Sequence, residues 1–368
     1  MLNAPPRSPP GTGPAVSREP FFMDPRVLQV ITGDALGGTE RFFERLVTAL
    51  HRDGIQQLVL LRDIADRLTL LREAGLHPVP MKYEGLSLFV RRRIKGYIRS
   101  FQPGLVVAWT PETVHHVTGM GVPVLGRWGA GRPLEEYRHC QHLLVHRGAE
   151  RETLLSRGWP RERIHLLPPL VDQTPADPMA RKTLFTPAHA PLLFAAGQMT
   201  DRRDFATLLQ VVQRLPDVYL WLAGDGPERE RLETIAYELG IKPRVRFLGW
   251  RDNLGPLYAA SDLVVCTGRD GVPDHAAVEA WAHGKPIVAI GPLDPGSAIR
   301  ENENALLLPS DDIVTIVQGL KWLLTESDAL SILVNSGRET FAKGYMTAQV
   351  LAQYRGLFEH IAQEHGHP

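Results

Sequence analysis

The residues best suited to chemistry in this chain lie in glycine-rich segments, each placed directly after an expected strand. The first segment is Gly33–Glu40, in which Gly37 and Gly38 precede an expected helix. Paired glycines let the backbone approach a ligand, and the free N–H groups of a helix N-terminus attract an anion such as phosphate. The same residues also fit a tight strand-to-helix turn in which Thr39 caps the helix.

A second segment, Ala196–Phe205, places cationic side chains after another expected strand. Arg202 and Arg203 lie here, close to Gln198. An arginine at the carboxyl edge of a parallel sheet can pair with a diphosphate, because its guanidinium group matches two phosphate oxygens. A charged turn in water explains the same residues.

The most informative segment, Gly268–Pro286, combines a glycine-rich loop with a short helix of small residues. Glu279 lies among alanines on that helix, where a buried carboxylate is costly unless hydroxyl groups or a cation bind it. A sugar or a ribose supplies hydroxyl groups, whereas a salt bridge is the structural alternative. Asp274, which follows Pro273, is expected to cap the helix.

The elements that position these segments alternate between strand and helix, which predicts parallel sheets covered on both sides. Strands are expected at 27–32, 58–61, 106–109 and 122–125, and again at 192–196, 218–223, 245–248, 263–266, 287–290 and 305–308. A proline-rich break at 170–191 separates the two halves. Residues 1–25 hold seven prolines and two glycines, a composition that predicts a disordered tail.

Composition excludes several classes of protein. The 41 Lys and Arg balance the 41 Asp and Glu, whereas a general nucleic-acid binder is normally basic. Apolar runs fall short of the ~18 residues of a membrane span, and no signal segment opens the chain, so a cytoplasmic protein is expected. Cys140 and Cys266 are the two cysteines and are expected to be reduced thiols.

In this order and at this spacing, the segments resemble a GT-B glycosyltransferase of the family 4 (group 1) type. The family's characteristic turns and strands in the second half are matched by 197–204, Gly224–Pro227, 245–249, 260–262 and 270–279. The resemblance implies two Rossmann-like α/β domains that face each other across a cleft. Residues 26–171 would form the acceptor side and 172–345 the nucleotide-sugar donor side, with a helix in 346–362 crossing back to the first domain.

The resemblance also implies roles for individual residues. In the family, an arginine and a lysine hold the donor diphosphate, and their positions correspond to Gln198 and Arg203 in this chain. One of the two cations is therefore missing here, and Arg202 is the candidate to replace it. Glu279 matches the acid that binds the donor ribose. The rest of the implied donor-binding set is Gly37, Gly38, Gly249, Gly271 and Val272.

Two departures from the family pattern affect the candidate catalytic residues. The family's first acid falls on Gly271, and Asp270 is the nearest carboxylate. Either the loop has gained one residue and Asp270 reaches the donor sugar, or that carboxylate is absent. The histidine expected after strand 122–125 is missing, and His115 or its neighbour His116 is the candidate to replace it, although a histidine on a helix is more often structural.

The implied activity is a retaining, hexosyltransferase-like transfer from a nucleotide sugar to a lipid-linked or saccharide acceptor, in cell-surface polysaccharide or lipopolysaccharide assembly. No cofactor is expected, and the chain lacks an Asp-x-Asp motif, which argues against a metal at the donor site. The alternative is a catalytically impaired GT-B protein that binds a nucleotide sugar as a scaffold or partner subunit. Gln198, Asp270 and the missing histidine favour that alternative.

One further segment, Val90–Phe101, is expected to form a helix with an apolar stripe and five cations. Such a helix can lie on an anionic membrane surface, here the inner face of the membrane. The alternative is that the stripe packs on the first domain's sheet while the arginines stay in water. The two interpretations are compatible.

Overall fold

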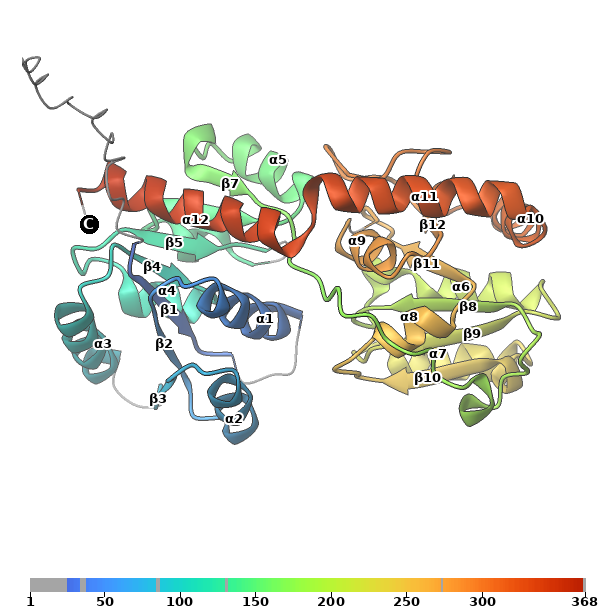
Figure 1. The fold of residues 1–368 in the computed structure, drawn as a ribbon, viewed down its shortest axis with the longest axis horizontal. Helices are drawn as coiled ribbons and strands as arrows, with labels where there is room; N and C mark the ends of the chain where they lie inside the picture. The colour runs from blue at the N-terminus through green and yellow to red at the C-terminus, as the bar shows by residue number, and fades with distance from the viewer. Residues whose placement is uncertain (1–24, 34–37, 84–86, 130–131, 273, 367–368) are drawn as a thin grey trace, which may run out of the picture.

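The computed structural model of the chain describes residues 25–33, 38–83, 87–129, 132–272 and 274–366. Nearly all of the predicted tail, 1–25, lies outside the described residues, and so does Gly37. The described residues form two α/β domains side by side, each built on one parallel sheet (Figure 1). The predicted fold class, α/β with two doubly wound domains, is confirmed.

The first sheet has seven strands in the order β3-β2-β1-β4-β5-β6-β7. Its strands are β1 Val27–Ile31, β2 Gln57–Arg62, β3 Val79–Met81, β4 Leu105–Ala108, β5 Val124–Arg127, β6 His142–Val145 and β7 Ile164–Leu166. Its helices are α1 Gly38–Arg52, α2 Ala65–Glu73, α3 Ser87–Phe101, α4 Pro111–Val117 and α5 Gly148–Ser156, with 3₁₀ turns η1 Leu134–Tyr137 and η2 Arg161–Arg163.

The second sheet has six strands in the order β10-β9-β8-β11-β12-β13. Its strands are β8 Leu192–Ala196, β9 Tyr219–Ala223, β10 Val245–Gly249, β11 Leu263–Thr267, β12 Ile287–Ile290 and β13 Leu306–Leu308. Its helices are α6 Phe205–Gln213, α7 Arg229–Glu238, α8 Gly255–Ala260, α9 Asp274–Ala282, α10 Ile313–Thr325 and α11 Ser327–Gly344, with 3₁₀ turns η3 Arg181–Leu184, η4 Asp201–Arg203 and η5 Lys242–Arg244.

Both faces of each sheet are buried under helices. In β1, Val27 and Ile31 belong to one apolar cluster, while Leu28 and Val30 belong to the cluster on the opposite face. Successive side chains of a strand point to opposite faces, so this division requires a layer of helices on each side. Each predicted strand overlaps an observed one, although β5 begins two residues later than the predicted 122–125, and the structure adds β3, β6 and β7.

The last helix, α12 Thr347–Glu364, follows the second domain but packs on the first. Figure 1 shows it lying along the first sheet, continuing the direction of α11. Val350, Tyr354 and Phe358 share a buried cluster with Phe43 and Leu46 of α1. The C-terminal helix is therefore part of the first domain's core.

Two smaller expectations can be compared with the structure. Cys140 and Cys266 are both buried and unpaired, in agreement with reduced thiols. Among the described helices, none has the length and apolar character needed to cross a membrane.

Candidate functional site

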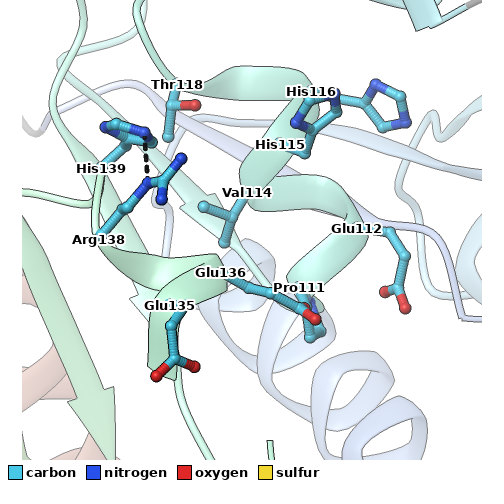
Figure 2. Close-up of a pocket in the computed structure, with 10 residues that line it drawn as sticks. All are labelled: Pro111, Glu112, Val114, His115, His116, Thr118, Glu135, Glu136, Arg138 and His139. Atoms are coloured by element: carbon cyan, nitrogen blue, oxygen red, sulfur yellow. Dashed lines mark hydrogen bonds between the residues drawn. The ribbon is translucent and has the colours of Figure 1, made fainter. Parts of the chain in front are cut away.

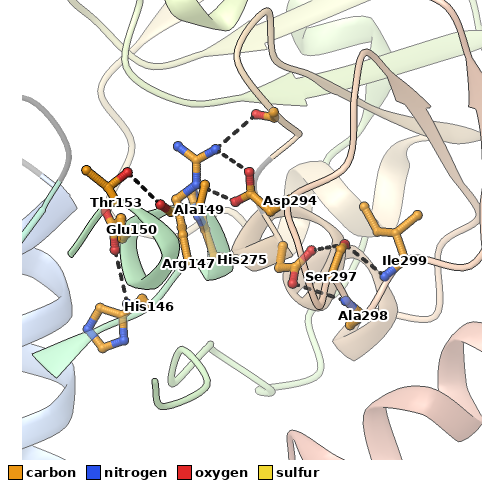
Figure 3. Close-up of polar contacts among 12 residues, drawn as sticks. His146, Arg147, Ala149, Glu150, Thr153, His275, Asp294, Ser297, Ala298 and Ile299 are labelled. Atoms are coloured by element: carbon orange, nitrogen blue, oxygen red, sulfur yellow. Dashed lines mark hydrogen bonds and ion pairs between the residues drawn. The ribbon is translucent and has the colours of Figure 1, made fainter. Parts of the chain in front are cut away.

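The two domains meet through loops that follow the carboxyl ends of their strands. Arg147, just after β6, binds Asp294, which follows β12, through Nε (2.6 Å) and Nη2 (2.9 Å) (Figure 3). Arg147 Nη2 also donates to the carbonyl oxygen of Gly271, 3.4 Å away. A Cβ on Gly148 would overlap the backbone oxygen of Pro295, so this close approach of the domains requires glycine.

Arg203 lies next to this interface, in the loop after β8. A Cβ on Gly197 would be 3.0 Å from the Arg203 guanidinium carbon, so the side chain lies directly over that glycine. Nη2 of Arg203 is 3.1 Å from Nε2 of His275 on α9. Among the described residues, no carboxylate lies within ion-pair distance of Arg203. Burial, and then the charge of Arg147, lower the pKa of Arg203.

Positive and imidazole groups converge around His275. His275 is exposed at its solvent-facing side, while many protein atoms lie around its ring. Desolvation first, and then the charges of Arg203, Arg147, His146 and Arg127, together lower the pKa of His275 to about 3. We call these five residues the cationic cluster; its three arginines carry the charge, because the lowered pKa keeps His275 and His146 neutral near pH 7.

The first domain contributes three members of the cationic cluster. Arg127 ends β5, and its Nη1 is 3.4 Å from Oγ1 of Thr39 in the first turn of α1. Its Nε is buried without a hydrogen-bond partner. Desolvation first, and Arg127 second, lower the pKa of His146 to about 3. Unmatched cationic groups beside a helix N-terminus favour a bound anion with several oxygens.

Glu279, on α9, connects the second domain to α1. Its side chain is 16% exposed and pairs with Nη1 of Arg45 at 3.2 Å. It also accepts a hydrogen bond of 3.3 Å from the hydroxyl of Tyr258. The sequence predicts either a cation or a ligand hydroxyl group as the partner of Glu279, and the structure is compatible with both. A cation already binds one carboxylate oxygen, and a ligand hydroxyl group can share the other.

A pocket of about 650 Å³ opens beside Arg45, between the two domains. It is lined by residues of α1, by residues 170–175 of the connection between the domains, and by Asp252 and Thr347. Arg41, on α1, binds Asp252 across this pocket. The domains are therefore joined by the ion pairs Arg41–Asp252, Arg45–Glu279 and Arg147–Asp294.

The remaining donor-binding residues predicted from sequence differ in their exposure and in their hydrogen-bond partners. Gly38 is the first residue of α1, and Gln198 is exposed. Gly249 ends the edge strand β10, where its carbonyl oxygen accepts from the N–H of Gly224. Gly271 contacts Arg147 through its carbonyl oxygen.

Val272 is not available as a ligand contact in this structure. Its side chain is fully buried, and its N–H donates to the carbonyl oxygen of Pro292 at 2.8 Å. The capping role predicted for Asp274 is not observed either. Its carboxylate accepts from Oγ of Ser297 and from the N–H of Ala298, so it fastens α9 to the loop after β12.

The two candidate catalytic residues have different surroundings. Asp270 is 62% exposed, and its Oδ2 is 3.4 Å from Nε of Arg202, which is 59% exposed. Arg202 therefore pairs with an exposed carboxylate, while Arg203 lies beside His275.

His115 lines a separate pocket of about 600 Å³ formed by α4 and the segment around η1 (Figure 2). The lining residues all belong to the first domain: Pro111, Glu112, Val114, His115, His116, Thr118, Glu135, Glu136, Arg138 and His139. The structure therefore does not place His115 with Arg203 or Glu279. Desolvation lowers the pKa of the neighbouring His116, which is buried.

Sequence reasoning missed Arg45, Arg127, Arg147, His275 and Asp294. Arg147 does carry a local signal, because Arg147-Gly148 lies one residue beyond the end of the short strand β6. Asp294 similarly lies in a Pro-Leu-Asp-Pro-Gly loop after β12. Neither signal indicates that the two loops meet, since that depends on how the domains dock.

Comparison with known proteins identifies the family. The family model described as Glycosyl transferases group 1 matches residues 178–340. The lipopolysaccharide core biosynthesis glycosyltransferase LpsD of Rhizobium meliloti (strain 1021) is 30% identical over 329 residues, which cover 88% of this chain and 95% of LpsD. The chain belongs to the group 1 glycosyltransferases.

Two further similarities agree with this assignment. The lipopolysaccharide core biosynthesis glycosyltransferase LpsE of the same strain is 29% identical over 330 residues, covering 87% of this glycosyltransferase and 95% of LpsE. The crystal structure of Anabaena HepE in complex with UDP and glucose superimposes with a TM-score of 0.79 at 16% identity, over 91% of this glycosyltransferase and all of that chain. The expected GT-B architecture is thereby confirmed.

Proposed function

We propose that this glycosyltransferase transfers a hexosyl group, with retention of configuration, from a nucleoside diphosphate sugar to a saccharide or lipid-linked acceptor in lipopolysaccharide core assembly. The observation that supports it most directly is Arg203 of the cationic cluster, which pairs with no carboxylate among the described residues, whereas Arg147 is already bound to Asp294. LpsD and LpsE, named for lipopolysaccharide core biosynthesis, support the acceptor class. HepE, whose structure holds UDP and glucose, supports the donor class.

In this proposal the protein's own charges stabilise the leaving diphosphate. As the bond to the sugar breaks, negative charge grows on the diphosphate, and Arg203 is placed to neutralise it. The first turn of α1 adds N–H groups and the positive end of a helix dipole. These groups supply the positive charge that the reaction needs, so we propose catalysis without a metal ion or other cofactor.

The carboxylate of Glu279 is the proposed ribose ligand. It lies between Arg45 and Tyr258, and its side chain stays 16% exposed. A carboxylate accepts hydrogen bonds from hydroxyl groups more strongly than an amide does. We therefore expect Glu279→Gln to weaken donor binding about tenfold while leaving the fold unchanged.

The test combines binding with turnover. Nucleotide sugars, beginning with UDP-glucose, are screened for thermal stabilisation, and the donor that binds is then assayed for release of nucleoside diphosphate with lipopolysaccharide core acceptors. NMR of the product reports the anomeric configuration. Tight binding without release to any acceptor would favour a non-catalytic binding protein. Glu339→Gln on α11, an exposed acid paired with Lys343, is the matched control for Glu279→Gln.

We also propose that α3 contacts an anionic membrane surface, on the inner face of the membrane. Val90, Ile94 and Ile98 are buried in the first domain's core, so the apolar stripe packs on the protein itself. Leu88 and Phe89, at the start of the helix, are 74% and 68% exposed. The helix carries no acidic residue, and most of its cations face water.

Arg91 is not one of the free cations of α3. Its guanidinium group donates to the carbonyl oxygens of His115 and Thr118, so it fastens α3 to α4. Arg92, Arg93 and Lys95 are exposed and are the residues with which to test membrane contact.

Replacing Arg92, Arg93 and Lys95 with serine should abolish sedimentation with anionic vesicles at low salt and leave the melting temperature unchanged. Each basic residue near an anionic surface adds about 1 kcal/mol of attraction, so three together account for roughly a hundredfold in partitioning. Serine at the exposed Arg157, Arg161 and Arg163 removes the same three charges elsewhere and provides a control for net charge. Equal losses in both variants, or a wild-type protein that never sediments, would refute the contact.

A further inference from the structure

A group of histidines lies at the opposite end of β6 from Arg147. His142 is the first residue of β6 and is 1% exposed. Its Nε2 is 3.3 Å from Nε2 of His365 and 3.6 Å from Oε2 of Glu364. Glu364 ends α12 and His365 follows it, so these three side chains join the C-terminal end of α12 to the first sheet.

We propose that His142, Glu364 and His365 form a binding site for a divalent zinc-type cation that fastens the end of α12 to β6. This proposal is independent of the donor site, at which no metal is expected. The three ligand atoms lie within 4.8 Å of one another. Two imidazole nitrogens and one carboxylate oxygen are a ligand set that zinc commonly takes in proteins.

The spacing of the ligand atoms fits tetrahedral coordination. Zinc–nitrogen and zinc–oxygen bonds are about 2.0–2.2 Å long, so two ligand atoms of a tetrahedral ion are roughly 3.3–3.6 Å apart. The distances from Nε2 of His142 to its two partners, 3.3 and 3.6 Å, agree with that range. An ion can therefore enter between the three groups with little rearrangement.

The other nitrogen of His142 is positioned by a neighbouring histidine. Nδ1 of His142 is 3.0 Å from Nε2 of His165 on β7. If Nδ1–H donates to His165, the lone pair of His142 Nε2 points toward Glu364 and His365. A ring N–H held in this way fixes the tautomer and orientation of metal-binding histidines. Desolvation is the main cause that lowers the pKa of His142 to about 4, and neutral imidazole is the form that binds metals.

The fourth position of the ion is left to water. Nε2 of His360, one turn before Glu364, is 3.7 Å from the Glu364 carboxylate and its side chain is 61% exposed, but it does not belong to the group of ligand atoms that lie close to one another. A water molecule can complete the tetrahedron. Because α12 reaches this point from the second domain, the ion would hold the end of a helix that links both domains.

The test uses the full chain without a polyhistidine tag, freed of metal with EDTA and dialysed. Titration with ZnCl₂, followed by calorimetry, should show one ion per chain and a rise in melting temperature that saturates at the same ratio. Co²⁺ should give the intense visible absorption of a four-coordinate ion.

Variants at the end of α12 separate this site from adventitious binding. Glu364→Gln and His365→Ala should each weaken Zn²⁺ binding at least tenfold, and neither removes a buried side chain. Glu359→Gln, on the preceding turn of α12, should bind like the wild type. Absence of stoichiometric binding, or unchanged affinity in both Glu364→Gln and His365→Ala, would overturn the proposal and leave a hydrogen-bonded histidine cluster.

Discussion

Arg203→Ala should weaken the binding of a nucleoside diphosphate by about 10- to 150-fold. A hydrogen bond to a charged group contributes roughly 1.5–3 kcal/mol, and 1.4 kcal/mol corresponds to a factor of ten. Arg203 is expected at the high end because no described carboxylate competes for it. Its guanidinium group also lies against Gly197, which restricts its orientation before ligand arrives. Calorimetric titration with the nucleotide of the preferred donor measures the change.

The neighbouring arginine provides the control for this variant. Arg202 is exposed and pairs with Asp270, so Arg202→Ala removes the same formal charge from the same loop. Affinity should fall less than threefold, since an exposed charge is screened by water and salt. If both variants lose the same affinity, the loop attracts the ligand through net charge, and the specific role of Arg203 is wrong.

The sequence predicts the second sheet more completely than the first. The strands expected at 192–196 and 287–290 coincide with β8 and β12, because long apolar runs between turns leave few alternatives. In the first sheet, β3 and β7 have three residues each. With Pro80 or His165 at the centre, neither strand shows a continuous apolar run, unlike the three leucines of the equally short β13. The pairing of β3 and β7 is stabilised by the neighbouring strands, which sequence does not reveal.

The candidate site also contains features that sequence predicts and features that it does not. The sequence predicts that Glu279 lies beside a cation or a hydroxyl group, because a carboxylate among alanines needs such a partner. That the cation is Arg45, 234 residues away in sequence, depends on the docking of the domains. Val272 shows the reverse case: the family pattern suggested a ligand contact, yet its N–H is already bonded to Pro292.

The ion pair between Arg147 and Asp294 should contribute more to stability than any other pair between the domains. The Asp294 side chain is 3% exposed and that of Arg147 is 24% exposed. The hydrogen bonds that Arg147 donates to the Asp294 carboxylate are the main cause that raises the pKa of Arg147. We expect Arg147→Ala to destabilise the protein by about 3 kcal/mol, because it leaves a buried carboxylate without its cation.

Denaturant unfolding measures the loss of stability in Arg147→Ala, and small-angle X-ray scattering measures the change in the arrangement of the domains. Since the pair joins the two domains, Arg147→Ala is expected to enlarge the radius of gyration while the circular dichroism of the folded protein stays the same. Arg151→Ala, one turn further along α5, removes an arginine that pairs with the exposed Glu152. That control should change stability by less than about 0.5 kcal/mol.

The double variant Arg147→Ala/Asp294→Asn distinguishes a charge effect from a packing effect. If the cost of Arg147→Ala arises from the unpaired carboxylate, removing that charge should restore more than half of the lost stability. A neutral amide at Asp294 can still accept a hydrogen bond while being much less costly to bury. If the double variant is as unstable as Arg147→Ala alone, the arginine acts through its packing against Gly271 and the loop after β12, and the electrostatic account of the interface fails.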